Sequence, residues 1–155
     1  YWNLSGHNAG CIFDHELQLK SSTYLPTDST LIPEGVAVDV EGTPMDFTAA
    51  KKIGRDIKLP FPALEFGKGY DNCWVIDEFK PGRTQIVAVL TDRQSGRVLE
   101  VSTDMPGVQV YAGCWLAGSP INKAGRPDAP NVEAFPSTVL RPGEKYKRHI
   151  NFQFK

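Results

Sequence analysis

Hydrophobic residues along this chain occur in short runs that glycine and proline interrupt every few positions. The 155 residues include 12 prolines and 14 glycines, and no window carries an apolar i, i+3, i+4, i+7 pattern over the length that a stable helix needs. Short apolar runs bounded by turn residues are typical of β-strands. The expected strands are residues 12–19, 34–40, 72–77, 84–90, 98–103, 108–113 and 146–154. This pattern predicts an all-β protein, an antiparallel β-sandwich.

The last expected strand alternates most clearly. One set of alternate positions holds Tyr146, Arg148, Ile150, Phe152 and Phe154, and the other holds Lys147, His149, Asn151, Gln153 and Lys155. Alternate residues of a strand point to opposite faces. This strand is therefore predicted to have one apolar face and one polar face.

Turn residues predict how the other strands are connected. Residues 92–96, Asp-Arg-Gln-Ser-Gly, lie between the runs 86–90 and 98–101, which indicates a hairpin loop joining neighbouring antiparallel strands. Residues 117–141 contain four prolines and no periodicity, so they are predicted to be loop. A loop of that length is unusual inside a compact domain, which indicates that residues are missing there.

Length and charge limit the classes of function. A chain of 155 residues fits one domain. Its formal net charge of −1, with acidic and basic residues interspersed, argues against nucleic acid and against acidic membranes as partners, and a small neutral partner fits better. No apolar run approaches the roughly 20 residues of a spanning helix, and residues 1–6 lack the layout of a signal peptide.

The cysteines indicate the compartment. Cys11, Cys73 and Cys114 are odd in number and have no metal-ligand spacing, so we expect neither a disulfide framework nor a metal site. Reduced thiols favour a cytoplasmic location.

Several motifs occur in a fixed order along the chain. The first is Tyr-Leu-Pro-Thr-Asp-Ser-Thr-Leu-Ile-Pro-Glu-Gly at residues 24–35, and others follow at 42–47, 53–57, 69–71, 95–101, 106–113 and 135–146. By these motifs the chain resembles the C-terminal half of the aldose 1-epimerase, or galactose mutarotase, family. Residues 1–6, Tyr-Trp-Asn-Leu-Ser-Gly, begin in the middle of a family strand motif, and no methionine precedes them. We therefore expect a cleaved chain or part of a longer one.

The resemblance implies a fold and an activity. The fold is a large antiparallel β-sandwich of the galactose mutarotase-like type, of which residues 1–155 form the C-terminal portion of a single domain. Exposed sheet edges then imply an N-terminal half or a partner chain that completes the sandwich. The activity is interconversion of the α and β anomers of a free aldose, which needs one base and one acid and neither cofactor nor metal.

The family's two catalytic groups do not map onto this chain. The acid histidine falls before Tyr1. The base glutamate falls at Asn122, counting back from residues 126–131, which match the end of the family's base segment. An amide cannot take a proton as a carboxylate does, and the short connection from residue 113 to 126 favours missing residues over a replacement. Glu133 lies nearby in a part of the motif where the family has no acid.

Two residues match the family's sugar-binding positions. Asp71 ends the motif Gly-Tyr-Asp and corresponds to an aspartate that binds sugar hydroxyls, and a carboxylate can accept hydrogen bonds from two vicinal hydroxyls. Gln109 matches a glutamine of the family's sugar cleft, and alternation places it on one strand face with Tyr111. Trp115 follows that strand and is a candidate for stacking on a sugar.

The histidines within the chain are weaker candidates. His15 lies in an Asp-His-Glu run, but adjacent strand residues point to opposite faces, so a structural role is expected. His7 and His149 are expected at the surface.

Two functions stay open at this point. The first is an aldose 1-epimerase acting on an aldohexose of the galactose or glucose type, active only together with the missing N-terminal half; this chain alone is expected to be inactive. The alternative is a non-catalytic, mutarotase-like subunit that serves as a carbohydrate-binding or structural module, because a fold does not guarantee its usual function.

Overall fold

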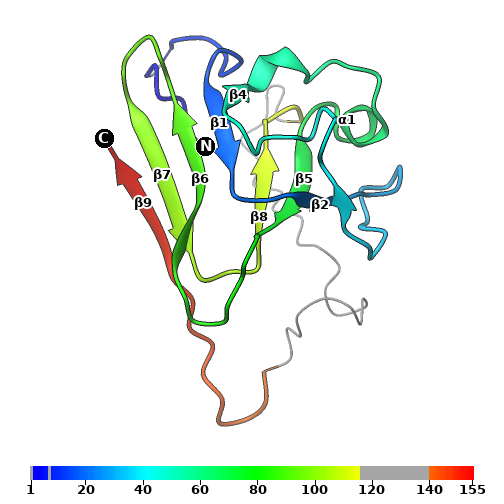
Figure 1. Cartoon of the computed structure of the whole chain (residues 1–155), viewed down its shortest axis with the longest axis vertical. Coiled ribbons are helices and arrows are strands. Elements are labelled where there is room, and N and C mark those ends of the chain that lie inside the picture. The colour runs from blue at the N-terminus through cyan, green and yellow to red at the C-terminus, as the bar shows by residue number, and fades with distance from the viewer. Residues whose placement is uncertain (1, 7, 116–139) are drawn as a thin grey trace.

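Two antiparallel β-sheets make up most of the protein (Figure 1). The structure, a computed structural model, describes residues 2–6, 8–115 and 140–155. The five-stranded sheet has the order β4-β1-β6-β7-β9, with β4 Lys51–Lys52, β1 Glu16–Leu19, β6 Gln85–Thr91, β7 Val98–Thr103 and β9 Ile150–Phe154. The four-stranded sheet has the order β3-β2-β5-β8, with β3 Val38–Asp39, β2 Thr23–Leu25, β5 Asp71–Val75 and β8 Gly107–Tyr111. The predicted all-β, antiparallel architecture is confirmed.

One hydrophobic core joins the two sheets. The five-stranded sheet contributes Leu17 and Leu19 from β1, and the four-stranded sheet contributes Trp74 from β5. Trp74 is fully buried, packs edge-on against Phe47 with ring centroids 5.9 Å apart, and donates its indole N–H to the Met45 carbonyl at 3.0 Å. A buried indole needs such a partner for its single donor. The core therefore fixes β5, the strand that begins at Asp71.

The predicted hairpin between β6 and β7 is present. Thr91 of β6 pairs with Val98 of β7, and the turn between them is closed by two backbone hydrogen bonds at Asp92: its N–H donates to the Arg97 carbonyl at 3.0 Å and its carbonyl accepts from Gly96 at 2.9 Å. Gly96 has a φ of 74°, a conformation that glycine adopts without steric cost. Strand β7 has the bounds that the sequence predicted.

Several predicted strands are shorter in the structure. Residues 12–15 form a turn instead of the start of β1, because the His15 N–H donates to the Ile12 carbonyl at 3.1 Å. Of residues 34–40 only Val38–Asp39 are strand, and the final strand begins at Ile150 instead of Tyr146. Strands β5, β6 and β8 differ from the predicted bounds by one or two residues at their ends.

Four short elements were not predicted. These are β2, β4, the 3₁₀ helix η1 (Ile53–Arg55) and the helix α1 (Pro62–Gly67). Helix α1 has six residues, which is too short to show a helical period, and proline at its first position fits the fixed φ of that residue. Lys68 ends the helix in the left-handed conformation, at φ 55°.

The apolar face of β9 is present, but the residues that the structure describes leave it about half exposed. Ile150, Phe152 and Phe154 are 57%, 50% and 55% exposed. Trp2 contacts two of these rings, with centroids 5.4 Å from Phe152 and 5.2 Å from Phe154. In Figure 1, β9 lies at the outer side of its sheet, away from β5 and β8.

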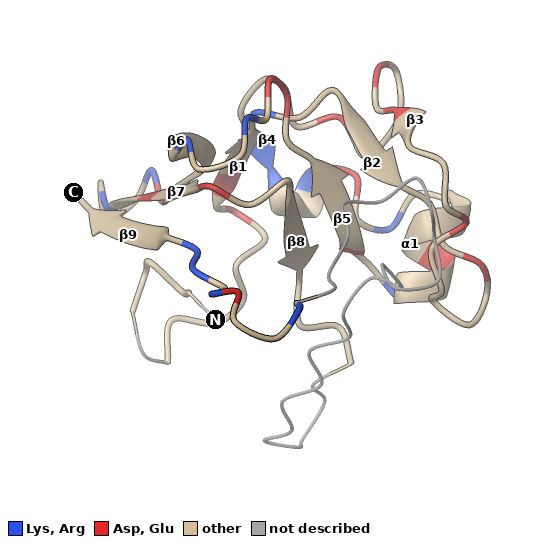
Figure 2. Ribbon diagram, turned by 90° about the horizontal axis from the view of Figure 1, so that it is seen from below, with Lys and Arg blue, Asp and Glu red and all other residues tan. Residues whose placement is uncertain are grey.

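Charged residues do not separate into regions of one sign. Figure 2 shows acidic and basic residues mixed over the loops and strand ends that the structure describes, in line with the net charge of −1. Within the described ranges, no helix has the length and apolar character needed to cross a bilayer.

Candidate functional site

The structure brings the two predicted sugar-binding residues together on strands β5 and β8. Asp71 begins β5 opposite Tyr111, and Gln109 of β8 lies opposite Cys73, so Asp71 and Gln109 are diagonal neighbours. The Gln109 Nε2 donates a hydrogen bond to the Asp71 Oδ1 at 2.9 Å. Asp71 is half-buried and Gln109 is exposed. The alternation predicted for β8 is confirmed, because Val108 and Val110 pack against the core.

Burial controls the titration of groups around this pair. Burial raises the pKa of the Asp71 carboxyl, and the hydrogen bond from Gln109 opposes that rise. Burial also raises the pKa of the Cys73 thiol to about 11. Burial, followed by the nearby charge of Asp71, raises the pKa of the Cys114 thiol. The two cysteines are thus uncharged thiols at neutral pH.

Close packing on the preceding segment holds Asp71 in place. After α1, Lys68 has a φ of 55° and Gly69 a φ of 134°. A side chain at Gly69 would collide with the Cys114 sulfur and press on Ile57. The position therefore needs glycine both for its backbone angle and for space. Two residues later the chain enters β5 at Asp71.

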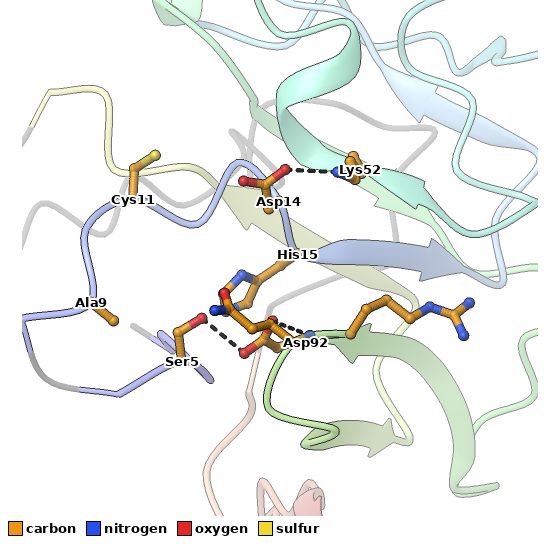
Figure 3. A pocket seen from close by; sticks show the side chains of 9 residues that line it. Ser5, Ala9, Cys11, Asp14, His15, Lys52 and Asp92 are labelled. Atoms are coloured by element: carbon orange, nitrogen blue, oxygen red, sulfur yellow. Dashed lines mark hydrogen bonds and ion pairs between the residues drawn. The ribbon is translucent and has the colours of Figure 1, made fainter.

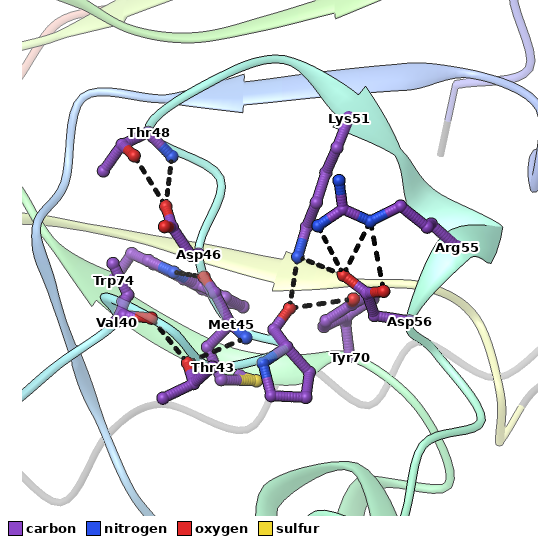
Figure 4. A network of polar contacts seen from close by, with 11 residues as sticks. Val40, Thr43, Met45, Asp46, Thr48, Lys51, Arg55, Asp56, Tyr70 and Trp74 are labelled. Atoms are coloured by element: carbon purple, nitrogen blue, oxygen red, sulfur yellow. Dashed lines mark hydrogen bonds and ion pairs between the residues drawn. The ribbon is translucent and has the colours of Figure 1, made fainter.

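Tyr70 is held by a network of polar contacts behind the site (Figure 4). Its hydroxyl donates to the Pro44 carbonyl at 3.1 Å, and the same carbonyl accepts from the Lys51 Nζ at 2.6 Å. Lys51 is buried and also pairs with Asp56 at 2.7 Å. Burial lowers the pKa of Lys51, while Asp56 opposes that change. This network anchors the residue immediately before Asp71.

A second set of contacts lies beyond the end of β8. The Tyr111 hydroxyl accepts a hydrogen bond from the Trp115 backbone N–H at 2.9 Å. The Lys68 ammonium lies over the Trp115 ring, 4.0 Å from its centroid. Trp115 is 47% exposed. Lys68 could not be predicted from the sequence, because its contact with Trp115 depends on the turn that follows α1.

A separate polar pocket of about 350 Å³ lies beside the N-terminal segment (Figure 3). His15 lines it but is buried, and its Nε2 accepts the Leu4 N–H at 2.9 Å. Asp92 accepts from the Ser5 hydroxyl at 2.8 Å, and Asp14 pairs with Lys52 at 2.8 Å. Since these polar groups already hold the N-terminal segment and the neighbouring loops, the pocket is structural. The predicted structural role of His15 agrees with this geometry.

Among the described residues, the remaining candidates make no contact with Asp71 or Gln109. His149 is half-exposed at the other sheet, where its backbone N–H donates to Asp104 at 2.8 Å. Asn122, Glu133 and His7 lie outside the described residues.

The geometry supports binding more than proton transfer. A carboxylate and an amide side by side offer acceptors and a donor to adjacent hydroxyls of a polyol. The groups described around this pair are the Asp71 carboxylate, the Gln109 amide and two thiols of raised pKa. That is enough to orient a sugar, whereas ring opening needs both a base and an acid.

The fold places the protein in a known structural class. A solved GalM/aldose epimerase homologue from C. elegans superimposes with a TM-score of 0.74, covering 100% of this chain and 49% of that one at 24% sequence identity. The chain therefore has the GalM-like antiparallel β-sandwich fold over about half of that structure. The sequence profile described as aldose 1-epimerase matches residues 1–153. This chain belongs to the aldose 1-epimerase family.

Sequence relatives agree on the extent of the match. Galactose mutarotase from Rattus norvegicus is 36% identical over 169 residues, covering 99% of this chain and 47% of the relative. Aldose 1-epimerase from Escherichia coli K12 is 29% identical over 170 residues, covering 99% of this chain and 48% of the relative. The chain spans about half the length of these relatives. Since 169 exceeds the 155 residues of this chain, the rat protein has residues inside the shared region that this chain lacks.

Proposed function

We propose that this chain, as the C-terminal portion of a single aldose 1-epimerase domain, binds an aldohexose and supports interconversion of its anomers. The observation that carries the proposal is the hydrogen bond between Asp71 and Gln109 on neighbouring strands. Both residues match the family's sugar positions, and family membership makes the match relevant. A cytoplasmic location stays a prediction.

In this proposal Asp71 and Gln109 orient the sugar. The Asp71 carboxylate accepts hydrogen bonds from two vicinal hydroxyls, and the Gln109 amide donates to or accepts from a third. Fixing the ring places the anomeric hydroxyl and the ring oxygen next to the proton-transfer groups. A base then removes the proton from the anomeric hydroxyl while an acid protonates the ring oxygen, so the ring opens and recloses on either face.

Neither the acid nor the base is among the described residues. The acid histidine belongs to the segment before Tyr1, and the base position falls at Asn122. We therefore expect mutarotation only when this chain is joined by the part of the sandwich that it lacks.

The exposed face of β9 is the proposed contact with that part. Phe152 and Phe154 are about half exposed, and the outer edge of β9 has no strand partner among the described residues. Large exposed apolar patches mark interaction surfaces, and unpaired strand edges add further strands. Since the family's proteins are about twice as long, we assign this face to a polypeptide corresponding to their other half.

The alternative is a non-catalytic subunit that keeps the sugar surface as a binding module. It is favoured by the residue at the base position, because the Asn122 amide cannot act as a base. The two functions differ in turnover, and sugar binding is common to both.

Polarimetry on freshly dissolved α-D-galactose separates them, with the native assembly at catalytic concentration. Acceleration of the optical change above the spontaneous rate supports the epimerase, and no acceleration supports the binding module. Within an active assembly we expect Asp71→Ala to lower kcat/KM at least about 100-fold. Asp39→Ala, which removes an exposed aspartate from β3 of the same sheet, is the matched control and leaves kcat/KM unchanged. An unchanged rate in Asp71→Ala refutes the assigned site.

A further inference from the structure

We infer that the indole of Trp115 forms an aromatic wall of the sugar site and that Lys68 braces it from one side. The inference rests on the proposed function, because it concerns the same site, formed by Asp71 and Gln109. It adds apolar stacking to the hydrogen bonds of Asp71 and Gln109.

The first step is that the segment carrying Trp115 is tied to the strand pair that carries Asp71 and Gln109. Cys114 immediately precedes Trp115, and the Asp71 charge acts on its thiol. Tyr111 pairs with Asp71 across β5 and β8, and its hydroxyl accepts the Trp115 N–H at 2.9 Å. The hydrogen bond from Trp115 to Tyr111 thus ties the segment that carries the indole to the strand next to the one that carries the carboxylate.

The second step is that the indole is held in place but not covered. The Lys68 ammonium lies 4.0 Å from the ring centroid, a cation–π contact on one face. The side chain is nevertheless 47% exposed. A bulky aromatic residue fixed at its backbone and braced on one face keeps surface available to a ligand without a large loss of side-chain entropy on binding.

The third step is the chemistry of the ligand. A pyranose has hydroxyls at its rim and C–H groups on its faces. Hydroxyls bound by Asp71 and Gln109 leave a C–H face free to pack on an aromatic ring, and small-molecule sites combine apolar walls with a few placed polar groups in this way. Trp115 is therefore a positioning residue for the sugar.

The cationic brace explains an otherwise unfavourable backbone at Lys68. A lysine at φ 55° occupies the left-handed region, where glycine is preferred at a helix C-terminus. Placing the ammonium over Trp115 gives this residue a role that glycine lacks. Lys68→Gly consequently removes the brace and relaxes the backbone at once, so this variant keeps its fold.

The test is an NMR titration of the full chain with D-galactose, following the Gln109 side-chain amide signal to obtain Kd. We expect Trp115→Ala to raise Kd about fivefold, as for the loss of roughly 40 Å² of apolar contact, and Trp115→Phe to stay within about twofold of the unaltered chain. Lys68→Gly should give an intermediate rise. Trp2→Ala, which removes a similarly exposed tryptophan at 44%, is the matched control and should leave Kd unchanged.

The outcomes separate this inference from the proposed function. If Asp71→Asn weakens binding and Trp115→Ala does not, the inference is overturned and the proposed function stands. An unchanged Kd in Lys68→Gly overturns the bracing role of Lys68. If the unaltered chain does not bind D-galactose, or Asp71→Asn binds as well as it does, the proposed function fails and the inference falls with it.

Discussion

Strands β1 and β9 of the five-stranded sheet have the same kind of surface and opposite surroundings. Leu17 and Leu19 of β1 are 6% and 1% exposed, under the four-stranded sheet. Phe154 of β9 is 55% exposed. The change occurs between neighbouring strands: Leu99 of β7, directly opposite Phe154, is 1% exposed. The apolar face of the five-stranded sheet thus extends further than the four-stranded sheet that packs on it.

The burial of apolar side chains therefore depends on the layer that packs against the strand as well as on the strand itself. In both β1 and β9 alternate residues are apolar, which is typical of a strand with one buried face. The covering sheet ends before β9, and Trp2 of the N-terminal segment contacts Phe152 and Phe154 on β9. The uncovered end is where the other half of the family's sandwich is proposed to pack.

Truncating one side chain in β1 and one in β9 should give the largest difference in stability between the two strands. Leu19→Ala removes a fully buried side chain and should lower the free energy of unfolding by about 3 kcal/mol. Phe152→Ala removes a larger side chain that is already half exposed, so we expect a loss of no more than about 1 kcal/mol. Urea denaturation of both variants gives the two values. Equal losses would mean that β9 is covered in solution.

A charge on the apolar face of β9 tests what covers it. Phe152→Glu should leave the stability of this chain within about 1 kcal/mol of its original value, because the side chain is half exposed. It should weaken association with the other half of the sandwich at least about 100-fold, because a buried unpaired charge is costly. Sedimentation equilibrium measures the association.

Asn151→Asp is the control for Phe152→Glu, since it adds the same charge to the opposite face of the same strand. If both variants associate normally, the apolar face is not the contact. Self-association of the unaltered chain that Phe152→Glu abolishes would identify a second copy as the occupant instead.

A smaller effect is expected at the turn that connects the two covered strands β6 and β7. Hydrogen bonds from the Ser95 and Ser5 side chains, with the Gln94 N–H, lower the pKa of Asp92 to about 2. The unfolded value is about 3.9. The stabilisation is therefore complete above about pH 4 and disappears as the pH falls towards 2.

Asp92→Asn should lower the Tm by about 3 °C at pH 7 and make no difference near pH 2. Thermal unfolding followed by circular dichroism at several pH values gives the profile. Asp39→Asn, on an exposed strand residue, should leave the Tm unchanged. A Tm difference in Asp92→Asn that persists at pH 2 would show that the carboxylate charge is not its cause.

The sequence predicted the longer strands and missed the features that depend on distant partners. Strand β7 could be predicted because its alternation and flanking turns are local. Strands β2 and β4 have three and two residues, and they are strands only because β5 and β1 pair with them. The exposure of Phe152 could not be predicted, because alternation shows that a face is apolar and does not show what covers it.

The candidate site likewise contains residues that could be predicted from the sequence and residues that could not. Asp71 and Gln109 are 38 residues apart, and no local pattern places them on neighbouring strands; the family resemblance singled them out. Alternation along β8 was sufficient to predict that the Gln109 side chain is exposed. The position of Lys68 depends on a six-residue helix and a left-handed residue, and neither has a signature in an apolar pattern.

Hydrogen exchange in β9 can be compared between the chain alone and its native assembly. We expect the backbone amides of Ile150–Phe154 that point away from β7 to exchange quickly in the isolated chain and to become protected in the assembly. Amides of β1, which are covered in both states, should change little and serve as the reference. Equal exchange of the β9 amides in the two samples would contradict the claim that β9 joins this chain to the rest of the aldose 1-epimerase sandwich through its free edge.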